Sequence, residues 1–280
     1  MLSNNWKTFF EYICENNSYC PVVDLNSNNP NKIFIANIPD PKIVNDFFKN
    51  DQLLNLNDPV FIALIPNPSK IFATIFCCNV TLEQIHKKFH SFGLAVEGCF
   101  HVDKKSGYPN FQQSVNAEDE REILTIAGTE LNIPTSYLVI ENHIATKIVS
   151  KKVIDNQQPV GVTQQYIEGL LLYENGKSIF DSTFKQFDLM QKYRSVIGKT
   201  TGALIVAFDL NGQMFIISQS KLNAYNVQPL LSSFQCRDAI LLCASESPHL
   251  IWKSSGFNTY NHTNFIGNPS DTVSGVLCLS

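Results

Sequence analysis

Residues 193–252 contain the sequence feature that most constrains the fold, which is a pair of strand-like runs separated by a tight turn. The runs at 195–206 and 213–218 are rich in apolar, β-branched and aromatic residues, which favour strands because they pack well on a pleated surface. Asn211-Gly212 lies between them, and Asn-Gly between two such runs indicates a hairpin. A helix near 226–234 and a strand at 239–242 follow. This order predicts antiparallel strands with a helix packed on them.

Similar apolar runs occur along most of the chain. The runs 60–65 and 71–76 flank Pro66-Asn67-Pro68 and predict another hairpin. Further strands are expected at 32–38, 94–96, 136–140, 145–149, 169–173 and 272–279, and helices at 2–16, 40–50 and 81–92. The predicted class is α+β, with a large, mostly antiparallel or mixed β-sheet and flanking helices.

Two helix starts have capping signals. Asp40 is followed by Pro41, which suits the first helical position, and Thr81 can accept a hydrogen bond from the first turn of the helix that follows it. The 280 residues are enough for one substantial core. We therefore expect an N-terminal helix and strand extension at 1–58 and one larger domain at 59–280.

Composition excludes several classes of partner. The net charge of −4 supplies no broad positive field for phosphate backbones, so we expect no nucleic acid. No window reaches 18 apolar residues, so we expect no membrane span. The first twenty residues lack the apolar run of an export signal, which predicts a cytoplasmic protein and leaves delivery to another compartment open.

No motif for a cofactor or a metal stands out. The eight cysteines have irregular spacing without a C-x-x-C pair, which favours reduced, buried thiols. Neither a Walker loop nor a G-x-G-x-x-G segment occurs, so we expect no cofactor. Glu83, His86 and His90 follow helical spacing and could hold a metal, but the intervening Lys87 and Lys88 favour a solvated helix face.

Four segments of the chain follow one another in the same order as four sequence motifs of a known family. The chain has Glu-Gly-Cys-Phe at 97–100, Gly-Tyr-Pro at 107–109, Arg-Ser-Val-Ile-Gly at 194–198 and Asp-Ala-Ile-Leu-Leu-Cys-Ala-Ser-Glu-Ser at 238–247. They resemble the Asn-Gly-Gly-Phe-Phe, Pro-Gly, Arg-Thr-Ala-Ile-Gly and Asp-Ala-Leu-Asn-Leu-Asp-Gly-Gly-Gly-Ser segments of the phosphodiester glycosidase family. The mammalian member of that family removes N-acetylglucosamine to uncover mannose 6-phosphate. The resemblance covers about residues 60–280.

The resemblance implies a site that binds a phosphosugar or another glycoconjugate. Arg194 would hold the phosphate, since a guanidinium makes bidentate contacts to phosphate, and Glu97 would act as general acid or base. Asp238 is the third catalytic candidate, and either Glu246 or Asp103 is available as a second carboxylate. The pocket is predicted to be lined by His101, Tyr108, Ser245, Glu246 and Ser247. The alternatives are a surface arginine, a solvated loop glutamate and a structural aspartate before a strand.

Departures from the family motifs leave three functions open. Glu97 replaces the first Asn of the family, Cys99 replaces a Gly, and residues 243–245 replace Asp-Gly-Gly. The first hypothesis is a diverged hydrolase that cleaves a sugar-1-phosphodiester. The second is a catalytically inactive relative that binds a phosphosugar or a protein partner. The third is a cysteine hydrolase with Cys243 or Cys99 as the nucleophile.

Overall fold

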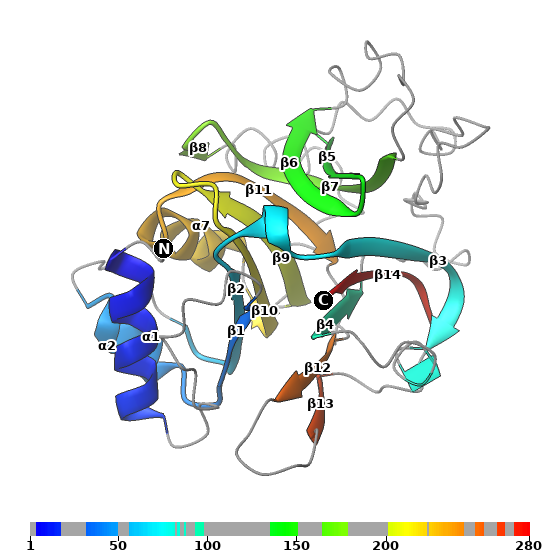
Figure 1. The fold of residues 1–280 in the computed structure, drawn as a ribbon. Coiled ribbons are helices and arrows are strands. Elements are labelled where there is room, and N and C mark those ends of the chain that lie inside the picture. The colour runs from blue at the N-terminus through cyan, green and yellow to red at the C-terminus, as the bar shows by residue number, and fades with distance from the viewer. Residues whose placement is uncertain are drawn as a thin grey trace.

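The computed structural model describes residues 4–17, 32–49, 56–81, 83–84, 87, 93–97, 135–150, 164–178, 201–222, 224–243, 250–254, 262–266 and 272–280 (Figure 1). In this part of the chain nine strands form one sheet, the main sheet, in the order β1-β2-β10-β9-β11-β7-β5-β6 with β8 beside β7. Their bounds are β1 Phe34–Ile38, β2 Val60–Ile65, β5 Thr135–Glu141, β6 Ile144–Ser150, β7 Gln164–Glu174, β8 Lys177–Ser178, β9 Thr201–Asp209, β10 Met214–Leu222 and β11 Cys236–Cys243.

A second sheet has five described strands in the order β13-β12-β4-β14-β3. Their bounds are β3 Ala73–Thr81, β4 Leu94–Glu97, β12 Leu250–Ser254, β13 His262–Ile266 and β14 Thr272–Leu279. The strand pairs described in both sheets are antiparallel. The helices are α1 Asn4–Asn16, α2 Lys42–Phe47 and α7 Ala224–Ser233, with a 3-10 turn, η1, at Pro68–Lys70. The prediction of a large antiparallel sheet is confirmed, while the small helical share makes α+β only an approximate description of the class.

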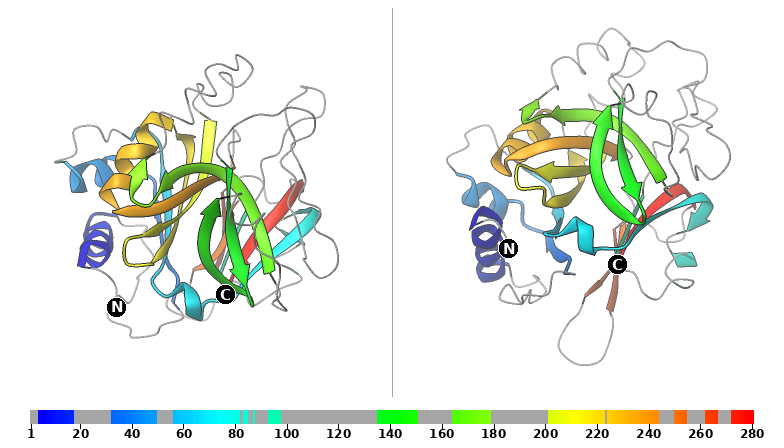
Figure 2. Two further views of the ribbon diagram at one scale, coloured as in Figure 1. Left: turned by 90° about the horizontal axis from the view of Figure 1, so that it is seen from above. Right: turned by 45° about the horizontal axis from the view of Figure 1, so that its top comes forward.

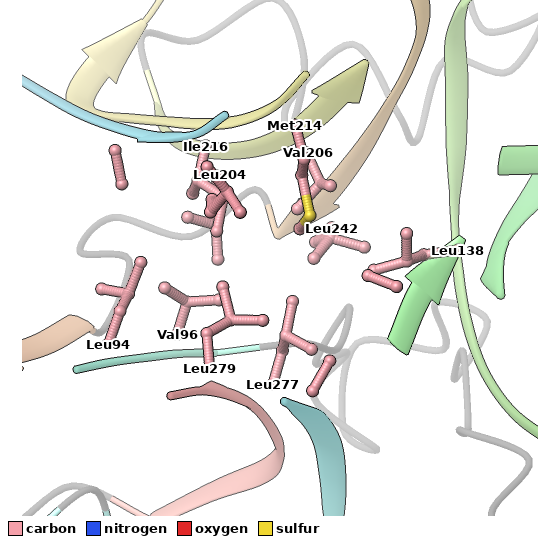
Figure 3. Packing of buried hydrophobic residues seen from close by; sticks show 14 of the residues in the cluster. Leu94, Val96, Leu138, Leu204, Val206, Met214, Ile216, Leu242, Leu277 and Leu279 are labelled. Carbon is pink, nitrogen blue, oxygen red and sulfur yellow. The ribbon is translucent and has the colours of Figure 1, made fainter. Parts of the chain in front are cut away.

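The main sheet lies between the helices and the second sheet, and an apolar core fills each side. On one side Trp6 and Phe10 of α1 and Leu231 of α7 pack against the main sheet. On the other side the two sheets face each other. Figure 3 shows Leu94, Val96, Leu277 and Leu279 of the second sheet opposite Leu204, Val206, Met214, Ile216 and Leu242 of the main sheet. Central strands are therefore buried on both faces, which is why every residue of β2 is apolar.

The N-terminal helix packs on the main sheet through aromatic side chains. The Trp6 ring is stacked on Phe234 with 4.3 Å between the ring centroids. The Trp6 indole Nε1–H donates a hydrogen bond of 3.0 Å to Asp209 Oδ2. Asp209 Oδ1 accepts hydrogen bonds from the backbone N–H groups of Asn211 and Gln213, both at 2.8 Å, which shapes the predicted hairpin turn between β9 and β10. In Figure 2, α1 (blue) lies away from the green strands β5 and β6 at the far end of the main sheet.

The predicted hairpin between residues 60–65 and 71–76 is wrong. β2 pairs with β1 and β10 in the main sheet, whereas β3 pairs with β14 in the second sheet. The connection contains the 3-10 turn η1 and takes the chain from one sheet to the other, so the two apolar runs face each other through the core and exchange no ladder hydrogen bonds. The strands β12 and β13 were not predicted from the sequence.

Candidate functional site

Glu97 is the last residue of β4 and pairs with Val276 of β14. Leu94 and Val96 belong to the core between the sheets, so the alternation of strand side chains places Glu97 on the opposite face of the second sheet. The Glu97 side chain is only 4% exposed. It is therefore a buried strand residue and differs from the solvated loop glutamate of the alternative interpretation.

The described residues that share this face with Glu97 on β4 and β14 are apolar. Val276 pairs with Glu97, and Cys278 pairs with Ala95, so all four residues share one face of the second sheet. Ala95, Val276 and Cys278 are buried. Apolar side chains beside a carboxyl group exclude water, and electrostatic contacts to a ligand are stronger where water is excluded. Glu97 thus lies beside buried apolar side chains on this face of the second sheet.

The ends of β11 and β12 lead the chain to the same part of the fold. Cys243 ends β11 in the main sheet, and Leu250 begins β12 and pairs with Val96, the residue before Glu97. The chain therefore leaves the main sheet at Cys243 and enters the second sheet beside Glu97. The substrate-binding candidates on this connection, Ser245, Glu246 and Ser247, lie outside the described residues.

Five other candidates also lie outside the described residues, namely Cys99, His101, Asp103, Tyr108 and Arg194. The described part of the chain after Arg194 starts at Thr201. This residue begins β9 and pairs with Leu222 of β10. That Arg194 and Glu97 contribute to one site stays a prediction.

Asp238 lies in a different place from Glu97. Its Oδ1 accepts a hydrogen bond of 3.0 Å from the backbone N–H of Asn175, and its Oδ2 accepts one of 2.6 Å from Arg237 Nε. These contacts hold the turn between β7 and β8. Asp238 precedes Cys243 by five residues, about 16 Å along a strand. The structure does not bring Asp238 to the end of β11 from which the predicted substrate loop departs.

The helical start at Thr81 has the predicted cap. The Thr81 hydroxyl accepts a hydrogen bond of 3.1 Å from the backbone N–H of Gln84, and the Gln84 side chain accepts one of 3.0 Å from the N–H of Thr81. This reciprocal pair is a capping box. Glu83 is ion-paired with Lys87 at 2.6 Å, while His86 and His90 lie outside the described residues. Among the residues with described positions, no group of three metal-ligating side chains occurs.

Two buried cysteines have thiols that resist ionisation. Burial raises the pKa of Cys236 above its ordinary range, and the nearby Asp238 and Asp209 carboxylates raise it further. Burial likewise raises the pKa of Cys278. Both side chains are almost fully buried, as expected for thiols that behave as small apolar groups.

Two buried serines were missed by the sequence reasoning. Ser136 of β5 and Ser218 of β10 have hydroxyl groups that are buried and have no hydrogen-bond partner in the described structure. Ser218 follows Ile216 by two residues, so both point to the core between the sheets. The sequence signal for Ser218 is a serine at a position of an apolar strand whose side chain points to the core.

Comparison with solved structures finds likeness at the level of the fold. The chain is similar to the zebrafish N-acetylglucosamine-1-phosphodiester alpha-N-acetylglucosaminidase catalytic domain, which was solved auto-inhibited by its pro-peptide. That match has a TM-score of 0.57 and 16% identity, and it covers 90% of this chain and 84% of that chain. A hypothetical protein from Synechocystis matches with a TM-score of 0.45 and 12% identity over 81% of this chain and 60% of that chain.

No family model matches the chain, and no curated protein matches its sequence. The part of the chain that the structure describes has no helix long and apolar enough to cross a membrane. The likeness to the zebrafish domain thus shows a distantly shared fold.

Proposed function

We propose that the protein is a diverged phosphodiester glycosidase-like hydrolase that cleaves a sugar-1-phosphodiester. The observation that carries this proposal is the buried carboxyl group of Glu97 at the end of β4. It occurs in a fold similar to that of a phosphodiester glycosidase over most of both chains. The motif order from residue 97 to residue 247 supports the same assignment.

In the proposed reaction Glu97 works at the glycosidic oxygen. Glycoside hydrolysis breaks the bond between the sugar carbon and the leaving oxygen. One carboxylic acid protonates the leaving oxygen, and a second carboxylate either activates the water that attacks the sugar carbon or attacks that carbon itself, before water releases the sugar. Glu97 takes the first role in this proposal, and Glu246 is the candidate for the second. Arg194 binds the phosphate through its planar set of N–H donors. The catalytic role predicted for Asp238 stays a prediction, since its carboxylate is engaged at the turn between β7 and β8.

The test is turnover of a synthetic sugar-1-phosphodiester by matched variants. Glu97→Gln keeps the size of the side chain and removes the transferable proton, so we expect turnover to fall by about 10²- to 10⁴-fold. Glu174→Gln at an exposed position of β7 is the control and should leave turnover unchanged. Asp238→Asn separates the two roles of the third candidate: a loss of turnover would support catalysis, and a loss of stability with unchanged turnover would restrict Asp238 to the turn between β7 and β8. Full turnover in the Glu97→Gln variant would remove the carboxyl group from the mechanism.

A catalytically inactive relative is the second candidate, and the replacement of the family Asp-Gly-Gly by residues 243–245 favours it. Such a protein would bind a phosphosugar or a protein partner without cleaving a substrate. Wild-type protein that shows no turnover, but whose melting temperature rises in the presence of a sugar phosphate, would establish this alternative, because a ligand that binds only the folded state stabilises that state.

A further inference from the structure

The dipeptide Asn-Gly occurs twice in the chain, at Asn175-Gly176 and at Asn211-Gly212. The first pair lies in the turn between β7 and β8, and the second lies in the turn between β9 and β10. Both asparagines are exposed. Asparagine followed by glycine is prone to deamidation, because glycine has no side chain that hinders attack by its backbone nitrogen. The chemistry of the two turns therefore makes each of them a candidate modification site.

Deamidation of Asn175 starts with attack of the Gly176 backbone nitrogen on the side-chain carbon Cγ. A bond forms between these two atoms and closes a succinimide ring, the bond between Cγ and Nδ2 breaks, and ammonia leaves with the proton of the Gly176 N–H. Water then opens the ring at either carbonyl, which yields aspartate or isoaspartate. The attack requires that the Gly176 nitrogen lose its proton and that the backbone around Asn175 rotate toward the side chain.

Hydrogen bonds to β11 oppose both requirements at Asn175. The Asn175 backbone N–H donates a hydrogen bond of 3.0 Å to Asp238 Oδ1, and the Gly176 N–H donates one of 2.8 Å to the Arg237 carbonyl. The Asp238 side chain is only 13% exposed and is itself held by Arg237 Nε. The peptide groups on both sides of Asn175 are thus bonded to β11, in a turn where Asn175 and Gly176 have φ angles of 51° and 76°.

The second Asn-Gly turn has the same two kinds of contact. The Asn211 N–H donates to Asp209 Oδ1 at 2.8 Å, and the Gly212 N–H donates to the Asp209 carbonyl at 3.1 Å. Asp209 ends β9 and belongs to the turn itself, whereas Asp238 is 63 positions away from Asn175 in the sequence. The contact at Asn175 can therefore be removed without changing its own turn, and Asn211 serves as a reference in the same molecule.

We propose that Asn175-Gly176 is a latent deamidation site, which the hydrogen bond from Asn175 to Asp238 protects. This inference goes beyond the proposed function and does not depend on it. It gives the Asp238 carboxylate a chemical role at the turn, where it holds the backbone in a conformation that keeps the Gly176 nitrogen from attacking. Deamidation would place a second carboxylate in this turn near Asp238, and like charges at short distance repel.

The experiment follows both asparagines in the same samples. Folded wild type, Asp238→Ala and Glu174→Gln are incubated at mildly alkaline pH, and peptide mapping by mass spectrometry measures the fraction of each asparagine converted to aspartate or isoaspartate. Glu174→Gln is the matched control, because it removes an exposed carboxylate next to the same turn and keeps the Asp238 contact. Wild type in urea gives the rates of both sites without the folded turns.

We expect deamidation of Asn175 in Asp238→Ala to be faster than in wild type by about tenfold to hundredfold, the range of one hydrogen bond to a charged group. Asn211 should keep its wild-type rate in this variant, and Glu174→Gln should match wild type at both sites. Equal rates at Asn175 in wild type and Asp238→Ala would overturn the proposal. Equal acceleration of both sites in Asp238→Ala would also overturn it, because general unfolding, and not a local contact, would then explain the change.

Discussion

At the scale of single residues, the buried thiols of Cys236 and Cys278 make stability depend on alkaline pH. Burial raises the pKa of both thiols above the ordinary value of 9.0. In the unfolded chain the thiols ionise near that ordinary value, while in the folded protein they stay protonated. The unfolded state therefore binds fewer protons above about pH 9, and the free energy of unfolding falls as the pH rises, by up to about 1.4 kcal/mol per pH unit for each thiol.

The measurement is urea unfolding of wild type and of Cys236→Ala/Cys278→Ala at pH 8, 9 and 10. The double variant should lose less stability than wild type between pH 8 and pH 10. Burial also raises the pKa of Tyr173, and this tyrosine is present in both proteins. Equal losses in the two proteins would show that the thiols ionise as readily in the folded state as in the unfolded state.

At the scale of elements, the Gln165 side chain joins the edge of the second sheet to the main sheet. Gln165 lies in β7, and its Oε1 accepts hydrogen bonds from the Ile75 N–H at 3.1 Å and the Thr74 hydroxyl at 3.3 Å. Its Nε2–H donates to the Ile75 carbonyl at 3.5 Å. The carboxamide thus bonds both backbone groups of Ile75 on β3, the last strand of the described second sheet.

We expect Gln165→Ala to lower the free energy of unfolding by about 1 to 3 kcal/mol, because it leaves buried backbone groups of Ile75 without these partners. Hydrogen exchange at the Ile75 amide should be faster in this variant. Gln228→Ala, at an exposed position of α7, is the control and should be nearly neutral. Unchanged exchange at Ile75 would show that the amide is protected by other contacts.

At the scale of the whole molecule, the Trp6–Asp209 hydrogen bond joins residues 203 positions apart in the sequence. Trp6→Phe keeps most of the aromatic packing and removes the indole donor from a carboxylate that is 1% exposed. We expect the free energy of unfolding to fall by about 1.5 to 3 kcal/mol, the range for hydrogen bonds to charged groups. Circular dichroism in urea measures this change, with one cooperative transition if α1 and the main sheet unfold together.

A double-mutant cycle with Asp209→Asn isolates the contact from the general cost of each substitution. The two single changes should not add, because both remove the same hydrogen bond. Strict additivity would mean that Trp6 acts through ring packing alone. An early separate transition in Trp6→Phe would instead support the predicted division of the chain at residue 58.

Some of the fold could be predicted because short-range geometry determines it. The predicted turn at Asn211-Gly212 is an example: Gly212 has a positive φ of 78°, a conformation that Gly adopts readily. The capping box at Thr81 is likewise a local pattern of residues three positions apart. Within the candidate site, the short apolar run before Glu97 identified β4.

Local patterns located most of the strands and turns, though not β12 and β13, because backbone dihedral preferences and capping act over a few residues. Only the tertiary structure decided that β2 and β3 belong to different sheets, that Glu97 is buried beside Val276, and that Asp238 holds a turn. The physical reason is that strand partners and burial depend on which apolar faces pack together across the chain. Residues 60–65 and 71–76 satisfy a hairpin and a two-sheet core equally well as local patterns, and only the core between the sheets distinguishes them.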